Sequence, residues 1–355
     1  MHRCLELAQS GAGYVAPNPM VGAVLVYKGR IIGEGYHQQF GKAHAEVNCI
    51  KSVSENDKEL IAHSCLYVSL EPCAHFGKTP PCTDLIIQHK IPEVIIGSRD
   101  PFAEVNARLN DEVGQGKGIE KLKAAGVKVE ASILENECRE INRRFFTFHE
   151  QHRPYIILKW AETSDHKIAG TSEEKLRITN DETNRLVHKW RSEEASILIG
   201  TNTALLDNPE LTTRYWNGPS PIRLVVDLDL KLPSLLHIFN KKQRTIIFNT
   251  LKNEESESLF FYKVSKDSDL IQQLVSALYK LNIQSVLVEG GAKLLQSFID
   301  REIWDEVRII KNEKPAPPAS GLIINNGLAA PNLINASGKK TITILNDTIS
   351  FFQPV

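Results

Sequence analysis

Short apolar runs recur along the chain, and polar or amphipathic segments separate them. Residues 21–27 are almost entirely apolar, residues 28–30 read Lys-Gly-Arg, and residues 31–35 resume with isoleucines and glycines, an order that predicts a β-hairpin. Strands that alternate with helices indicate α/β layers around a largely covered sheet. The further strands predicted in this part are 64–70, 93–97 and 127–131, and the helices are 1–6, 44–52, 82–89, 119–125 and 134–148.

A polar segment that ends in proline, residues 150–154, interrupts this pattern before a second α/β series begins. Because 355 residues exceed one average domain, we expect two domains, residues 1–150 and residues 151–355. The second series has predicted strands at 155–161, 195–201, 222–227, 245–249, 285–289 and 306–311, and predicted helices at 181–191, 270–281 and 292–299.

Composition narrows the classes of partner. The formal net charge of -1 gives no electrostatic argument for nucleic acid or an anionic membrane. No apolar run approaches the roughly 20 residues that span a bilayer, and the mixed polar and apolar start does not read as a secretory signal. We therefore expect a cytoplasmic protein with no nucleic-acid partner and no membrane partner. The six cysteines of such a chain are not expected to form a disulfide framework.

The strongest chemical pattern is His44-Ala45-Glu46 followed by Pro72-Cys73 and Pro81-Cys82. One imidazole and two thiolates suit Zn²⁺ and leave its fourth coordination position for water. Zinc lowers the pKa of that water from about 15.7 toward 7. The pattern His-x-Glu with downstream Pro-Cys is that of the zinc deaminases, in which the glutamate carries protons. The sequence therefore predicts hydrolytic removal of an amino group, with Glu46 as the proton carrier.

A structural zinc site is the alternative interpretation, and it would normally have four protein ligands. His75, which lies between the two cysteines, could supply the fourth. A third possibility is that the cysteines only pack. The catalytic interpretation is favoured because Glu46 has no role in a structural site, and His75 is then expected to contact substrate.

The wide spacing of the two cysteines differs from the Pro-Cys-x-x-Cys of nucleic-acid deaminases. With residues 70–73 (Leu-Glu-Pro-Cys), 17–22 (Pro-Asn-Pro-Met-Val-Gly) and 41–47 (Gly-Lys-Ala-His-Ala-Glu-Val), it resembles the pyrimidine deaminase of riboflavin biosynthesis. The resemblance covers residues 1–150. It implies a cytidine-deaminase-like three-layer fold in which Asn18, His75 and Lys78 contact the base and the ribose phosphate. By themselves, Asn18 could be a turn residue and Lys78 a surface charge.

Three features of the second part could carry chemistry. Lys159 lies inside an apolar strand, so it needs an acidic partner or a ligand, unless the strand is at an edge and the ammonium reaches water. Asp207 lies in a segment with an Asn-Pro turn, where it could simply initiate that turn. Gly290-Gly291 joins a buried strand to a helix, and such a helix start can hold a pyrophosphate, although glycines are common in tight turns.

Together these segments resemble the reductase half of the bifunctional riboflavin deaminase/reductases, a dihydrofolate-reductase-like α/β domain that uses NADPH. The resemblance spans about residues 154–300. It implies that Lys159 and Asp207 lie near the reacting carbon. The implied cofactor contacts are Ala161, Arg177, Thr203, Asp207, Gly291, Ala292, Lys293, Leu294, Leu295, Gln296 and Ser297, and the implied substrate contacts are Lys175, Arg191, Leu211, Arg214 and Glu289.

The chain departs from this family at two places. Many relatives have Ser-Leu-Asp-Gly where residues 163–166 read Thr-Ser-Asp-His, and many have Ser-x-Trp-Ile-Thr where residues 175–179 read Lys-Leu-Arg-Ile-Thr. Contacts at Lys175 and Arg177 therefore involve side chains of a different kind, either of which can meet a phosphate.

The predicted function is a bifunctional enzyme of riboflavin synthesis that needs Zn²⁺ and NADPH. It would deaminate 2,5-diamino-6-(5-phosphoribosylamino)pyrimidin-4(3H)-one and then reduce the ribosyl group of the product to ribityl. The partner is a small phosphorylated pyrimidine, and a homo-oligomer is expected. One alternative is a deaminase of another base or of nucleic acid with a non-catalytic second domain, and another is a zinc-stabilised regulatory protein.

Overall fold

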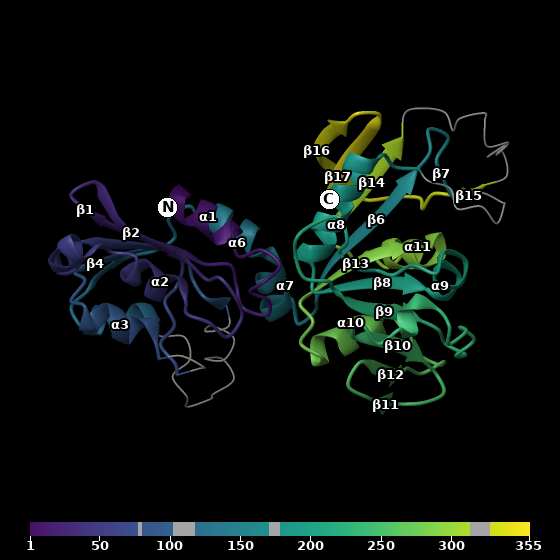
Figure 1. Cartoon of the computed structure of the whole chain (residues 1–355), viewed down its shortest axis with the longest axis horizontal. Coiled ribbons are helices and arrows are strands. Elements are labelled where there is room, and N and C mark those ends of the chain that lie inside the picture. Colours follow the sequence, from purple (N-terminus) through teal and green to yellow (C-terminus); the bar gives the residue numbers. More distant parts are fainter. Residues whose placement is uncertain (77–79, 102–117, 170–177, 313–326) are drawn as a thin grey trace. The chain divides into compact units, whose positions relative to one another are not determined.

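The computed structural model describes residues 1–76, 80–101, 118–169, 178–312 and 327–355 (Figure 1). It divides into two compact units, Met1–Arg153 and Pro154–Val355. Three residues with an expected role, Lys78, Lys175 and Arg177, lie outside the described residues. Among the helices within these ranges, none is long and apolar enough to cross a membrane.

The first unit is built on a sheet with strand order β2-β1-β3-β4-β5 in its described part. The predicted hairpin is confirmed, because β1 and β2 pair antiparallel. β1 also pairs antiparallel with β3, while β3, β4 and β5 run parallel. The strands are β1 (Gly22–Tyr27), β2 (Arg30–Tyr36), β3 (Cys65–Leu70), β4 (Glu93–Ser98) and β5 (Lys128–Glu130).

Helices cover both faces of this sheet, which makes the three layers that the resemblance implied (Figure 1). The helices α1 (His2–Gln9) and α6 (Glu135–Ile141) pack on one face. The opposite face carries α2 (Ala45–Lys51), α3 (Cys82–Gln88) and α5 (Gly118–Ala124), with the 3-10 helix η1 (Glu55–His63) beside β1. The main core cluster of the unit lies between the sheet and these helices, and it includes Leu25, Ile50 and Ile86.

The predicted single helix at 134–148 is wrong, since the chain forms α6 and then α7 (Arg143–Gln151). Asn142 separates the two helices with φ -105° and ψ 17°. Its side-chain amide binds the backbone of Met20 twice, accepting from the N–H and donating to the carbonyl at 2.8 Å each. Asparagine competes for backbone groups outside the regular helix pattern, so this tertiary contact breaks the helix.

The second unit contains a large mixed sheet whose described order is β11-β12-β10-β9-β8-β13-β6-β14-β17-β16. The strands from β12 to β14 in this order are parallel, and the pairs β11–β12, β14–β17 and β17–β16 are antiparallel. The strands are β6 (Tyr155–Glu162), β8 (Ser196–Gly200), β9 (Ile222–Val226), β10 (Thr245–Asn249), β11 (Glu254–Glu255), β12 (Leu259–Lys263), β13 (Ser285–Gly290), β14 (Glu306–Asn312), β16 (Ala336–Ile344) and β17 (Asp347–Pro354). β7 (Lys167–Ala169) and β15 (Leu328–Ala329) form a separate pair.

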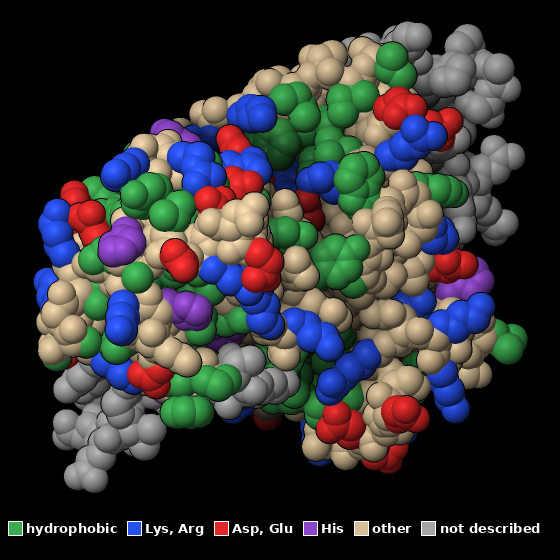
Figure 2. Space-filling model, turned by 60° about the vertical axis from the view of Figure 1, so that its left-hand side comes forward, with side chains coloured by type: hydrophobic (Ala, Val, Ile, Leu, Met, Phe, Trp, Pro, Cys, Tyr) green, Lys and Arg blue, Asp and Glu red, His purple; other side chains and the backbone are tan. Residues whose placement is uncertain are grey.

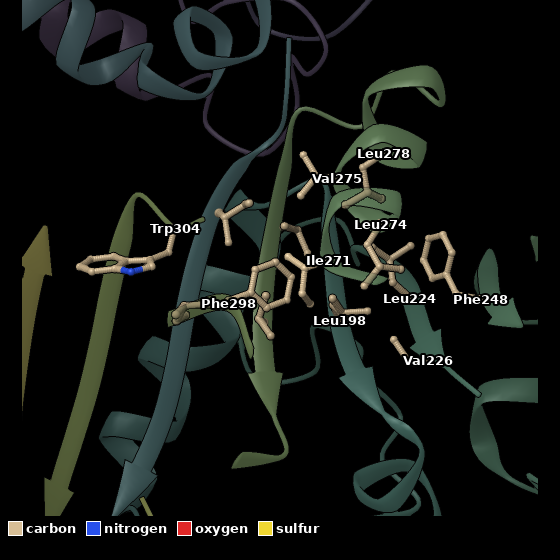
Figure 3. Packing of buried hydrophobic residues seen from close by; sticks show 14 of the residues in the cluster. Leu198, Leu224, Val226, Phe248, Ile271, Leu274, Val275, Leu278, Phe298 and Trp304 are labelled. Atoms are coloured by element: carbon tan, nitrogen blue, oxygen red, sulfur yellow. The ribbon is translucent and has the colours of Figure 1, made fainter. Parts of the chain in front are cut away.

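Alternate residues of these strands face two different layers. On one face, α10 (Leu270–Lys280) and α11 (Ala292–Ile299) pack through Leu274 and Phe298 on strand residues that include Leu198 and Leu224 (Figure 3). On the other face, Ile197 and its neighbours pack near α9 (Thr201–Asp207) and the 3-10 helix η2 (His237–Phe239). α8 (Asp181–Glu193) packs on this second face through Val187 and Trp190.

β6 lies between β13 and β14. The alternative in which Lys159 occupies an edge strand is therefore wrong. The segment around Asp207 also differs from a simple loop, because α9 ends at Asp207 and Asn208 caps it with φ 38°. Apolar periodicity did not predict α9, and it did not predict β16, whose residues are mostly exposed or half-buried.

Candidate metal centre and ligand cleft

Three side chains with metal-ligating atoms lie close together near the carboxyl end of β3 and the starts of two helices. His44 is the residue directly before α2, Cys73 follows the end of β3, and Cys82 is the first residue of α3. The Thr83 backbone N–H and hydroxyl both donate to the Cys73 carbonyl at 3.2 Å, which holds the two cysteine-bearing segments together. The start of α2, the end of β3 and the start of α3 therefore set the positions of the three residues.

The distances within this cluster fit zinc. The Nδ1 atom of His44 lies 3.6 Å from Cys73 Sγ and 3.4 Å from Cys82 Sγ. Zn–S and Zn–N bonds of about 2.3 and 2.0–2.1 Å at tetrahedral angles place the nitrogen and sulfur atoms about 3.6 Å apart. The three donor atoms lie within 4.8 Å of one another, and His75 is not part of this cluster of described ligating groups. The residues therefore form a three-ligand site.

The ionisation of Cys73 also suits a metal ligand. Its pKa is lowered to about 4, first by a hydrogen bond with the Cys82 thiol and further by one with His44, although burial acts in the opposite direction. The backbone N–H of Cys82 donates to the Cys73 sulfur at 3.3 Å. Because thiolates, not thiols, coordinate metals, this environment favours the binding form.

Glu46 lies in the first turn of α2 and is only 3% exposed. Its pKa is raised, mainly because burial disfavours the charged carboxylate, and the neighbouring Cys73 adds to this. It is not one of the three donors, yet it interacts with all three of them. A carboxyl group with a raised pKa beside a metal site is suited to accept and return a proton.

The residues expected around the base are placed as follows. Asn18 is half-buried, and its Nδ2 lies 3.1 Å from Nε2 of His37. His75 is half-buried between the two cysteines. His37 was missed by the sequence analysis, although it is 2% exposed and its Nδ1 lies 3.0 Å from the Ala43 carbonyl.

The carbonyl contact requires the His37 proton on Nδ1, so Nε2 accepts from the amide of Asn18 and leaves the Asn18 oxygen free to meet a ligand. The only sequence signal for this role is a histidine directly after a strand, which is weak.

In the second unit, Lys159 faces an ion pair. Arg191 on α8 binds Glu289 of β13 in a bidentate pair, with Nε–Oε1 at 2.9 Å and Nη2–Oε2 at 2.6 Å. Their side chains are 14% and 9% exposed. Burial lowers the pKa of Lys159, and the positive charge of Arg191 lowers it further. The negative charge of Glu289 acts in the opposite direction and raises it. The pKa of Glu289 is lowered to about 2 by Arg191 and Lys159 despite its burial.

The acidic group that acts on Lys159 among the described residues is thus Glu289, on the neighbouring strand. Asp207 is the last residue of α9 and is exposed. Its expected place near the reacting carbon stays a prediction. The side chain of Leu211 is buried in a core cluster, so a ligand contact there would come from its backbone.

A glycine turn joins β13 to α11. A Cβ atom on Gly291 would lie 3.1 Å from Thr203 Oγ1, and one on Gly200 would lie 4.0 Å from the Gly290 carbonyl oxygen. Gly290 has φ +134°, which L side chains rarely adopt. The starts of α9 and α11 therefore lie side by side at the carboxyl ends of β8 and β13, where open α/β sheets bind ligands. This close backbone cradle fits a dinucleotide phosphate, which helix N-terminal N–H groups can hold.

The first turn of α11 is the part that remains open to a ligand. Ala292 is half-buried and Lys293 is exposed there. Three further residues of α11 that were expected to contact the cofactor have contacts within the protein. Leu295 is 0% exposed in the core, and the Gln296 amide binds the backbone of Asn332. The Ser297 hydroxyl donates to the Lys293 carbonyl. Leu294 and Ala161 are half-buried near this end of the sheet.

Charged side chains are interspersed on the face drawn in Figure 2, where lysines and arginines alternate with aspartates and glutamates. Local groups that could meet a phosphate are the start of α11 and Arg191 beside Lys159.

Comparisons with known proteins agree for both units. Residues 1–98 match the family model of the cytidine and deoxycytidylate deaminase zinc-binding region, and residues 154–312 match the RibD C-terminal domain. The riboflavin biosynthesis protein RibD of Aquifex aeolicus is 37% identical over 99% of this chain and 97% of its own length. RibD of Escherichia coli is 32% identical over 86% of this chain and 85% of its own length.

A solved structure from Thermotoga maritima gives the same result. It is described as a diaminohydroxyphosphoribosylaminopyrimidine deaminase/5-amino-6-(5-phosphoribosylamino)uracil reductase. It is 34% identical, covers 100% of this chain and 97% of its own, and superposes with a TM-score of 0.84. The chain therefore belongs to the RibD family of bifunctional deaminase/reductases in riboflavin biosynthesis.

Proposed function

We propose that the first unit deaminates 2,5-diamino-6-(5-phosphoribosylamino)pyrimidin-4(3H)-one and that the second unit reduces the product, 5-amino-6-(5-phosphoribosylamino)uracil, to its ribityl form. The observation that carries the first step is the three-donor cluster of His44, Cys73 and Cys82 with the buried Glu46 beside it. A structural zinc site would have four protein ligands and no use for this glutamate.

Zinc in this cluster would supply the Lewis acidity that makes a water molecule nucleophilic at neutral pH. Glu46 accepts the proton of the attacking water and passes it to the ring nitrogen. It then carries the proton of the newly formed hydroxyl group to the amino group, which departs as ammonia while the carbonyl forms. Burial raises the pKa of Glu46, which makes the carboxylate a stronger proton acceptor than an exposed glutamate. Asn18, oriented by His37, and His75 bind the base and the ribose phosphate, and Lys78 assists them.

NADPH, when bound, would supply the reducing equivalent for the second step. Thr203, Gly291 and Ala292 would hold its phosphates. Lys159 supplies positive charge or a proton to the atom where negative charge develops, and Asp207 orients the substrate. Arg191 and Glu289 form an ion pair beside Lys159. Arg214 binds an anionic part of the substrate.

One experiment separates this proposal from its rivals. The protein is incubated with the diaminopyrimidine ribose phosphate, with and without NADPH, and both ammonia and NADPH are measured. We expect ammonia in both samples and NADPH oxidation only after ammonia release. Ammonia without any NADPH oxidation would leave a deaminase with a non-catalytic second unit, and neither product would favour a regulatory protein.

Zinc content and deamination are expected to be lost together. Cys82→Ser removes one of the ligands, so we expect zinc per chain to fall from one to near zero and ammonia release to disappear. NADPH oxidation with pre-deaminated substrate should persist, because the second unit does not use the metal. Zinc is measured by atomic absorption. Cys65→Ser, at a half-buried cysteine outside the cluster, is the matched control and should keep both zinc and activity.

A fragment that ends at Arg153 is expected to fold and to release ammonia. The two units have separate core clusters on separate sheets, so the first one does not need strands of the second. Circular dichroism and the ammonia assay check this. An unfolded fragment would show instead that residues 1–150 and 151–355 are not independent domains.

The cellular setting is part of the same proposal. The six cysteines are free, which suits a reducing compartment such as the cytoplasm. Assembly into a homo-oligomer is tested by light scattering of the purified chain.

A further inference from the structure

A buried imidazole on α8 holds the segment that carries Arg214. His188 is 1% exposed, and its Nδ1 atom lies 2.9 Å from the backbone nitrogen of Arg214. The backbone N–H is the donor, so Nδ1 must be the acceptor. The ring is therefore neutral with its proton on Nε2.

The segment after Arg214 lies across α8 and lines a pocket. Tyr215 contacts the His188 ring edge-on, with ring centroids 4.8 Å apart. Arg214, Tyr215, Trp216 and Asn217 line a pocket of about 630 Å³ together with Arg185 of α8. Two guanidinium groups and two aromatic rings are the groups that bind a phosphorylated ring compound.

A second contact fixes the far end of this segment. A Cβ atom on Gly218 would lie 2.7 Å from the Cβ of Ser192, which shows how closely the backbone there approaches α8. The backbone N–H of Thr213 donates to the Ser220 hydroxyl at 3.0 Å. This bond holds the two ends of the segment close together. The bond from Arg214 to His188 is the hydrogen bond that fixes the middle of the segment to α8.

The surrounding charges keep this acceptor available. The pKa of His188 is lowered to about 4, mainly by burial and then by the positive charges of Arg191 and Arg214. Lys159 also lowers this pKa, whereas Glu289 raises it. The same charged groups form the proposed reductase site. His188 thus joins the Lys159–Glu289–Arg191 cluster to the segment that carries Arg214.

We propose that His188 is a positioning residue of the reductase: Nδ1 fixes the backbone of Arg214 so that its guanidinium and the ring of Tyr215 face the substrate. This inference rests on the proposed function, in which Arg214 binds an anionic part of the substrate. A histidine that serves only core packing is the competing explanation. It predicts altered stability without a selective change in substrate binding.

The test compares two substitutions of similar size. His188→Leu removes the acceptor, whereas His188→Asn keeps an oxygen near the position of Nδ1. We expect the leucine variant to raise the KM for 5-amino-6-(5-phosphoribosylamino)uracil about tenfold, because a buried N–H loses its partner. The KM for NADPH should change little, kcat should fall less than the KM rises, and the asparagine variant should recover most of the loss. NADPH binding by each variant, followed by fluorescence, reports that the second unit is folded.

A double-mutant cycle shows whether His188 acts through Arg214. Arg214→Ala should raise the same KM, and adding His188→Leu should then raise it no further. If the two effects multiply, or if leucine and asparagine behave alike, the inference is overturned. If Arg214→Ala leaves the KM unchanged, the proposed substrate role of Arg214 fails instead.

Nitrogen NMR of the intact chain provides a test that does not depend on a variant folding. We expect Nδ1 of His188 to be unprotonated at neutral pH and its resonance to shift when the deaminated substrate is added. A proton on Nδ1 at neutral pH would contradict the assignment.

Discussion

Glu46→Gln is expected to keep one zinc per chain and to lower the rate of ammonia release by about 10²–10⁴-fold, the range that proton transfer by a positioned side chain contributes. The amide has almost the same shape as the carboxyl group, so the cluster of His44, Cys73 and Cys82 should remain assembled. It cannot accept the proton of the attacking water. NADPH oxidation with pre-deaminated substrate should be unchanged, because that reaction takes place in the other unit.

The controls for this variant are a surface glutamate and the metal content. Glu59→Gln, at an exposed position of η1, should release ammonia at the parent rate. Zinc content separates loss of proton transfer from loss of the metal. Turnover by Glu46→Gln near the parent rate, with zinc bound, would exclude the proposed role.

Lys159→Met is expected to lower NADPH oxidation by at least about 10²-fold and to leave ammonia release intact. Methionine has a similar length and fills the space within β6, so the sheet should tolerate it. The charge that acts on the reacting atoms is lost. The ion pair between Arg191 and Glu289 should remain intact, so Glu289 keeps a charged partner and the substitution should disturb the structure little.

The matched control is Lys280→Ala, at an exposed lysine at the end of α10. It should oxidise NADPH at the parent rate. Binding of NADPH, followed by fluorescence, distinguishes a chemical defect from a binding defect. An active Lys159→Met enzyme would exclude the lysine from the reduction step.

The strand and helix positions were largely predictable where apolar residues were dense. The hairpin of β1 and β2, the strands β3 and β4, and the helices α8, α10 and α11 follow local patterns and turn residues. Prediction was wrong where a single distant contact overrides local preference. The break between α6 and α7 depends on the bonds of Asn142 to Met20, which no window of neighbouring residues contains.

The residues expected to contact the cofactor show the same limit at the level of side chains. The residues of α11 were expected to act together, yet Leu295 belongs to the core and Gln296 binds the segment at Asn332. A helix presents only one face to a ligand, and packing decides which face that is. His37 and His188 carry no motif that the chain order reveals, because their roles come from single hydrogen bonds to Asn18 and Arg214.

By itself, the sequence determined the metal chemistry and the two-part α/β organisation, because ligand type, the His-x-Glu spacing and apolar periodicity are properties of the chain order. Only the tertiary structure decided which charges meet. It placed Glu289 of β13 and Arg191 of α8 beside Lys159 of β6, and it placed β6 inside the sheet. The physical reason is that electrostatic partners are chosen by distance in space, which strand order and helix packing set and which separation along the chain does not.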